Sequence, residues 1–158
     1  MKMHSDIECA LSSDANVLIA GGDATSRTAM ARLIHRRSKR RRGSLVVLSD
    51  TYSTDRWAAD PAEKVLAPET PGRTLFIEEL TALDGQTQEE LLQLLDTGTA
   101  RWNDGTTARR TRVISATAHN VLERLASKPF NTRLFYRLNV IHITLTERTR
   151  VATASSVH

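Results

Sequence analysis

The chain has 158 residues, of which 40% are hydrophobic and 25% charged, a composition that predicts one globular domain with a single sizeable core. No apolar run approaches the roughly 20 residues of a membrane helix, and the N-terminus lacks the apolar segment of a secretory signal. Cys9 is the only cysteine, which excludes an internal disulfide and a cysteine-based metal cluster and favours a reducing cytoplasm as the location.

The excess of positive charge is local. The net charge is +4, and the segment HRRSKRRRG (35–43) contributes Arg36, Arg37, Lys39, Arg40, Arg41 and Arg42. Such a run is able to hold nucleic-acid phosphates by charge alone. The alternative is a solvated helix end, where cations favour the negative end of the helix dipole. The absence of interleaved aromatic residues favours this alternative.

Five short β-type segments recur along the chain with helical or loop segments between them. They are NVLIA (16–20), SLVVLS (44–49), TLFIEE (74–79), TRVISAT (111–117) and NVIHITL (139–145). Most are continuous apolar runs, which indicates strands buried on both faces, as in a parallel sheet. Their alternation with helices predicts a three-layer α/β/α sandwich with right-handed crossovers.

The segments between the strands contain readable helices. Apolar residues at helical spacing predict a helix over 27–37, and QTQEELLQLLD predicts another over 86–96 that ends at Gly98. Shorter helices are expected over 120–127 and 132–138. The expected core consists of Leu18, Ile34, Leu75, Phe76, Leu91, Leu95, Ile114, Leu138 and Val140.

The remaining segments are expected to be irregular. Residues 51–71 contain three prolines and predict a loop with one short helix at 61–66, and 101–113 predicts a hairpin around an Asn-Asp-Gly turn. The expected organisation is a lead-in at 1–15, a core at 16–148 and a loose tail at 149–158.

Four blocks in order resemble the ATPase domain of sigma-54-dependent transcription activators, a branch of the AAA+ family. NVLIAGGDATSRTAMARLIHRRS is similar to VLIxGExGTGKExxAxxIHxxS, and GRTLFIEELTALDGQTQEELLQLLDTG to GGTLFLDEIxxLxxxxQxxLLxxLxxG. TRVISATAHNVL resembles VRIIAATNxxL, and FNTRLFYRLNVIHITLTER resembles FRxDLYYRLNVxxIxLPPLRxR. The resemblance implies a P-loop NTPase-like core with a five-stranded parallel sheet.

The first block departs from the phosphate-binding loop that the resemblance implies. The implied nucleotide-binding residues are Gly21, Gly22, Asp23, Ala24, Thr25, Ser26, Arg27 and Thr28. Arg27 replaces the lysine that would contact the terminal phosphates, and its planar fork does not fit the cradle in the same way. Ala24 and Ser26 replace glycines, so their β-carbons are expected to strain a loop that needs positive φ.

The second block implies the acidic pair of an ATPase. Glu79 corresponds to the catalytic general base, and Glu78 replaces the aspartate that supports Mg²⁺, with Thr28 as a further candidate metal ligand. The longer side chain of Glu78 is expected to disturb the metal geometry. Three interpretations stay open: an eroded site, a working site, and two carboxylates that simply end a strand.

In the last two blocks, some of the sensor and arginine residues that the resemblance implies are replaced. The sensor asparagine is Ala118, followed by His119 and Asn120, and one of the arginines that would reach a neighbouring subunit is Asn131. Arg137 is retained and is the candidate arginine finger, although a surface or salt-bridge role is equally compatible with the sequence. No segment resembles the GAFTGA contact loop, the helical lid or a helix-turn-helix.

The retained scaffold and altered site together predict a degenerate sigma-54-interaction-type domain. It is expected to act in bacterial transcriptional regulation through a protein partner, with weak or no binding of ATP and Mg²⁺ and no useful hydrolysis. The alternative is a nucleotide-binding switch that keeps phosphate binding through the eroded loop, because backbone N–H groups supply much of that binding. A homo-oligomer and nucleic-acid binding through Arg36–Arg42 are further possibilities.

Overall fold

The structure is a computed structural model that describes residues 2–38, 45–48, 74–97, 112–120, 123 and 130–146. Its elements are α1 (Lys2–Ser12), β1 (Val17–Gly21), α2 (Ala24–Arg37), β2 (Leu45–Leu48), β3 (Thr74–Ile77), the 3₁₀ turn η1 (Leu80–Ala82), α5 (Gly85–Thr97), β4 (Arg112–Thr117), α7 (Thr132–Leu138) and β5 (Ile141–Leu145). The five predicted strands and the helices predicted over 27–37, 86–96 and 132–138 are therefore confirmed. The loop at 51–71, the tail at 149–158 and most of the 101–113 hairpin and the 120–127 helix lie outside the described residues.

The five strands form one parallel sheet with the order β2-β3-β4-β1-β5. β1 lies inside the sheet, where Leu18 stands opposite Ser115 of β4 and His142 of β5. Because all strands run in the same direction, the residues that follow β1, β3 and β4 meet at one carboxyl edge. In open α/β sheets such an edge is the usual place for a ligand site.

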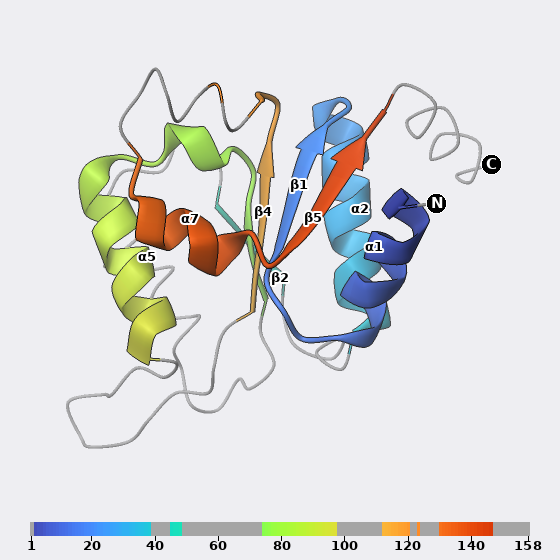
Figure 1. The fold of residues 1–158 in the computed structure, drawn as a ribbon, viewed down its shortest axis with the longest axis horizontal. Coiled ribbons are helices and arrows are strands. Elements are labelled where there is room, and N and C mark those ends of the chain that lie inside the picture. The colour runs from blue at the N-terminus through green and yellow to red at the C-terminus, as the bar shows by residue number, and fades with distance from the viewer. Residues whose placement is uncertain are drawn as a thin grey trace.

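Helices cover both faces of the sheet, as Figure 1 shows with α1 and α2 on one side and α5 and α7 on the other. One buried cluster joins α5 and α7 to residues such as Leu18, Leu75 and Val113. The other joins α1 and α2 to residues such as Ile19 and Ile114. The two separate cores confirm the predicted three-layer α/β/α architecture.

One predicted core residue is exposed. Val140 has an exposed fraction of 60%, whereas the other eight expected core residues are buried. The predicted strand 139–145 begins only at Ile141, because Asn139 is the C-cap of α7 and Val140 lies in the turn that follows. The prediction that Val140 belongs to the core was therefore wrong.

The N-terminal segment forms a helix that the sequence analysis did not predict. Ala10 of α1 is fully buried, and Ile7 and Leu11 pack against the same core as α2. Their spacing of three and four residues is the signal that identifies one apolar helix face. The segment treated as a lead-in thus contributes directly to the packing of the sheet.

Arg112, the first residue of β4, holds the end of α1 in place. Its side chain is 1% exposed, its Nε donates to the carbonyl oxygen of Ala15 at 2.9 Å, and its Nη2 donates to that of Ala10 at 2.9 Å. Ala10 lies in the last turn of α1, where helix carbonyls lack partners within the helix. Arg112 therefore joins β4 to α1 through a buried cap.

Replacing Arg112 by methionine is expected to reduce the free energy of unfolding by about 2–4 kcal/mol, because the carbonyl groups of Ala10 and Ala15 lose a charged donor. Urea unfolding followed by circular dichroism measures this loss. Arg32 is exposed on α2 and provides the matched control, since Arg32→Met is expected to change stability by less than about 0.5 kcal/mol. Equal losses in the two variants would contradict the capping role.

Candidate nucleotide site at the carboxyl edge of the sheet

The turn after β1 depends on two glycines in a left-handed conformation. Gly21 has a φ of +85° and Gly22 a φ of +61°. A β-carbon on Gly21 would lie 2.5 Å from the carbonyl oxygen of Leu145, and one on Gly22 would lie 3.1 Å from the Cβ of Leu145. Close approach and positive φ together therefore require glycine at Gly21, and positive φ favours it at Gly22.

Helix α2 begins earlier than predicted. It starts at Ala24 rather than at residue 27, with Asp23 in extended backbone geometry as its N-cap. The Oδ1 of Asp23 accepts the backbone N–H of Ser26 at 2.7 Å, and its carbonyl oxygen accepts that of Arg27 at 3.0 Å. The early start follows from this cap, which satisfies backbone donors of the first turn.

The expected strain at the substituted glycines is absent. Ala24 and Ser26 lie in the first turn of α2, and no described residue other than glycine has a positive φ. Their β-carbons therefore impose no strained backbone conformation. The prediction of strain was wrong because these positions have become helical instead of keeping the conformation of a glycine-rich loop.

The backbone ahead of α2 does not form an anion nest. Nests require neighbouring residues in αR and αL conformations, so that successive N–H groups converge. Here Ala20 is in a strand, Gly21 and Gly22 both have positive φ, and Asp23 is extended. The loop therefore lacks the αR–αL alternation that would direct its N–H groups onto a phosphate.

Arg27 folds back into this loop. Its side chain is 7% exposed, and its Nη1 donates to the carbonyl oxygens of Gly21 at 2.9 Å and Gly22 at 2.8 Å. Its buried Nε has no hydrogen-bond partner. The cation that corresponds to the phosphate-binding lysine thus contacts carbonyl oxygens of its own loop.

An open depression of about 390 Å³ lies beside the first turns of α2, lined by Ala24, Thr25, Thr28, Ala29 and Arg32. Thr28 and Glu78, the candidate metal ligands, share no contact among the described residues. In that same part of the chain, no group of three or more His, Cys, Asp or Glu side chains is placed to hold a metal ion.

Glu79, the candidate general base, is half-buried and accepts hydrogen bonds from the protein on both carboxylate oxygens. Its Oε2 accepts from the hydroxyls of Thr117 at 2.6 Å and Thr81 at 2.7 Å and from the N–H of Thr81 at 3.1 Å, while its Oε1 accepts the N–H of Ala118 at 2.8 Å. Burial raises the pKa of Glu79, but hydrogen bonds from Thr117, Thr81 and Ala118 outweigh it and hold the pKa below 4.5. The carboxylate joins the ends of β3 and β4.

Three residues near Glu79 in the sequence or at the end of β4 have exposed side chains. The side chain of Glu78 is exposed, and its backbone N–H donates to the carbonyl oxygen of Leu48 at 2.9 Å, which extends the pairing of β2 and β3. His119 and Asn120 are exposed. Asn120 accepts the N–H of Glu123 at 3.3 Å, a local contact away from Glu79.

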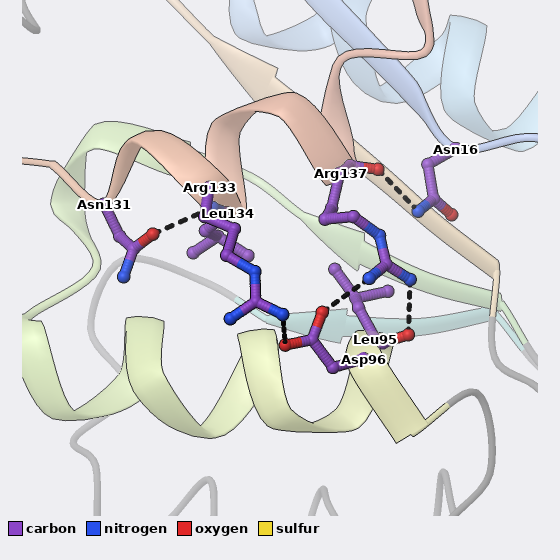
Figure 2. A network of polar contacts seen from close by, with 7 residues as sticks. All are labelled: Asn16, Leu95, Asp96, Asn131, Arg133, Leu134 and Arg137. Carbon is purple, nitrogen blue, oxygen red and sulfur yellow. Dashed lines mark hydrogen bonds and ion pairs between the residues drawn. The ribbon is translucent and has the colours of Figure 1, made fainter.

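Arg137, the candidate arginine finger, binds α5 within the same chain. Figure 2 shows its guanidinium on Asp96 and on the carbonyl oxygen of Leu95, while Arg133, one turn earlier on α7, pairs with the same carboxylate at 2.7 Å. The backbone carbonyl of Arg137 accepts the side chain of Asn16 at 3.0 Å. This network joins the last turn of α5, α7 and the start of β1.

Asn131, which stands where the resemblance implies an arginine, is the N-cap of α7. Its Oδ1 accepts the backbone N–H of Leu134 at 2.9 Å. Its own N–H donates to the Oε1 of Gln88 on α5 at 2.8 Å. The substitution thus supplies a helix cap that also contacts α5.

Several groups that the resemblance assigns to nucleotide binding are bonded within the chain itself. The loop presents carbonyl oxygens to Arg27, the carboxylate of Asp23 caps the start of α2, and Glu79 accepts four hydrogen bonds from protein donors. The loop at 21–28 and Glu79 follow strand ends at the carboxyl edge, whereas Arg137 lies near the start of β1, at the opposite edge.

The pKa of Glu79 predicts a pH-dependent contribution to stability. Because its native pKa lies below the ordinary value of 4.5, its ionised form stabilises the fold above pH 4.5, and this contribution is lost as the pH falls through the native pKa. Near neutral pH, Glu79→Gln is expected to lower the free energy of unfolding by about 1–2 kcal/mol. Urea unfolding of both proteins down to about pH 3 should show the difference shrink. A constant difference would contradict this assignment.

The two arginines of α7 are expected to differ in their effect on stability. Arg137→Met removes an ion pair and the contact with Leu95, and is expected to cost about 1 kcal/mol. Arg133 is 71% exposed, against 37% for Arg137, so Arg133→Met is expected to cost less than about 0.5 kcal/mol. Parallel urea titrations measure both losses, and a larger loss for Arg133 would refute the bridging role of Arg137.

Comparisons with known proteins agree with the resemblance seen in the sequence. The family described as Sigma-54 interaction domain matches residues 58–144, a range that includes Glu79 and Arg137 but not the loop at 21–28. The transcriptional regulatory protein ZraR of Klebsiella oxytoca is 30% identical over 147 residues, 83% of this chain and 33% of that protein. The chain thus spans about a third of the length of this curated relative.

Solved structures share the fold. NtrX from Brucella abortus in complex with ADP has a TM-score of 0.72 and 26% identity over 90% of this chain and 34% of that chain. The P-loop NTPase domain of a sigma-54 activator from E. coli has a TM-score of 0.64 and 21% identity over 90% of this chain and 99% of that chain.

Two further observations concern membrane-spanning helices and the basic run at 36–42. No helix among the described residues is long and apolar enough to cross a membrane. Arg36 and Arg37 end α2 and are exposed, while Lys39 to Arg42 lie outside the described residues, so the role of the basic run stays a prediction. The match over 58–144, more than half of the chain, shows that the chain belongs to the Sigma-54 interaction domain family.

Proposed function

We propose that this chain is a non-hydrolytic member of its family that acts in bacterial transcriptional regulation as an interaction or regulatory module. In this role it binds a protein of the transcription machinery, and it binds ATP weakly or not at all. Its location is the cytoplasm, where transcription takes place. The fold suits such a module, because a rigid sheet with a packed core on each face presents a fixed surface to a partner.

The backbone of the loop between β1 and α2 carries this proposal. Phosphate binding by such a loop depends on convergent backbone N–H groups. The positive φ values of Gly21 and Gly22, followed by extended Asp23, do not produce that convergence. A weak phosphate site is the expected consequence.

The environment of Glu79 supports the absence of hydrolysis. A general base has to accept a proton from a water molecule, and its basicity has to suit that step. The carboxylate of Glu79 already accepts four hydrogen bonds from Thr81, Thr117 and Ala118, and its lowered pKa makes it a weaker base. Its role in this proposal is to join β3 to β4.

Titration with a fluorescent ATP analogue, with and without Mg²⁺, tests the proposal. We expect a dissociation constant weaker than about 1 mM and no turnover above background. Arg27→Ala should change neither result, and Arg133→Ala on the exposed side of α7 is the matched control. Micromolar binding that is lost in Arg27→Ala but kept in Arg133→Ala would replace the proposal by a nucleotide-binding switch. Turnover abolished by Glu79→Gln would show a working ATPase.

A further inference from the structure

Three exposed arginines lie in the second half of α2: Arg32, Arg36 and Arg37. Every other arginine that the structure describes donates to a carbonyl oxygen or a carboxylate; these are Arg27, Arg112, Arg133 and Arg137. Among the same described residues, no hydrogen bond or ion pair gives Arg32, Arg36 or Arg37 a partner. The described arginines that are available to an external anion are therefore gathered on one helix.

The end of this helix is held in place from its buried side. The Nδ1 of His35 lies 2.9 Å from the hydroxyl oxygen of Thr74, and the hydroxyl of Ser38 donates to the carbonyl oxygen of His35 at 2.7 Å. Ser38 is only 2% exposed. Because Thr74 begins β3, the end of α2 lies at the amino edge of the sheet, opposite the loop at 21–28. Arg36 and Arg37 lie between these two anchors, so their backbone is already fixed before a ligand binds.

The charge around this helix end has one sign. The segment 24–49 contains no Asp or Glu, and the basic run at 36–42 continues directly from α2. Outside the segment, acidic residues outnumber Lys and Arg. The helix dipole favours cations in the last turn, but its effect fades beyond that turn and does not account for Arg32. An uncompensated positive surface of this kind attracts a polyanion.

The spacing and surroundings of these arginines favour duplex DNA over other polyanions. Arg32 and Arg36 are one turn apart on the same helix face, about 6 Å along the axis, and a strand of B-DNA carries one phosphate per about 3.4 Å. A duplex is held by phosphate contacts without base stacking, so the lack of aromatic residues in 24–49 disfavours only a single strand. A membrane surface requires a free apolar helix face, whereas Met30 and Ile34 of α2 are buried against the sheet.

We propose that the second half of α2 binds the phosphate backbone of duplex DNA, with Arg32, Arg36 and Arg37 as the contacting residues. The contact does not depend on base sequence, because the guanidinium groups bind phosphates rather than base edges. It goes beyond the proposed function and is independent of it, since the surface lies away from the candidate nucleotide site.

Fluorescence anisotropy of a labelled duplex of arbitrary sequence, about 20 base pairs long and titrated at about 50–200 mM NaCl, tests the proposal. We expect the triple variant Arg32→Gln/Arg36→Gln/Arg37→Gln to bind at least roughly tenfold more weakly at the lowest salt concentration. Arg36→Gln alone should reduce the slope of log K against log [NaCl] by about 0.9. Arg133→Gln on α7 removes the same charge from an exposed side chain and should leave the slope unchanged.

Urea unfolding followed by circular dichroism verifies that the variants fold. Unchanged affinity in the triple variant, or equal losses in Arg36→Gln and Arg133→Gln, would overturn the proposal. A loss that occurs only when the arginines at 40–42 are replaced by glutamine would place the contact outside α2 and overturn it as well. Tighter binding to a single strand, or to vesicles that contain phosphatidylserine, would replace duplex DNA as the partner. ATP titration of the unaltered chain decides the proposed function separately from all of these outcomes.

Discussion

The contact between Gly21 and Leu145 governs the geometry of the whole carboxyl edge. The two residues face each other in the register of β1 and β5, and a β-carbon on Gly21 would lie 2.5 Å from the Leu145 carbonyl oxygen. The chain is therefore able to leave β1 only through a glycine, and it does so with two successive positive φ values. Those values bring two carbonyl oxygens to Arg27, and the chain then reaches Asp23 in the extended form that caps α2.

Polar groups that correspond to site residues of the resemblance stabilise the scaffold by bonding to other parts of the same chain. Glu79 joins β3 and β4, Arg137 joins α7 and α5, and Asp23 closes the start of α2. Each of these groups has a functional counterpart in the resemblance, yet each has protein partners at hydrogen-bond distance. A ligand that took these groups would have to replace several hydrogen bonds at once. These bonds suit the proposed interaction module, whereas a nucleotide-driven motor would have to break them.

Much of the fold could be predicted because burial leaves a pattern in the residues. The apolar runs of β1, β3 and β4 correspond to strands buried on both faces, and all three are buried along most of their length. Helix α1 was missed although Ile7, Ala10 and Leu11 have helical spacing, because the segment is short and rich in polar residues. Val140 was misplaced because an apolar residue in a turn looks the same in sequence as one in a strand.

The sequence by itself determined the fold class, the order of the blocks and the membership of the family, because hydrophobic periodicity and motif spacing are local properties. It also identified the residues that gather at the carboxyl edge. Only the tertiary structure decided what those residues contact. The resemblance assigned Asp23 to the nucleotide-binding loop, whereas in the structure it caps α2. Glu79 reaches Thr117 through the pairing of β3 with β4, whereas Arg27 turns back onto Gly21 and Gly22 of its own loop. Both sets of contacts depend on distances that no linear pattern contains.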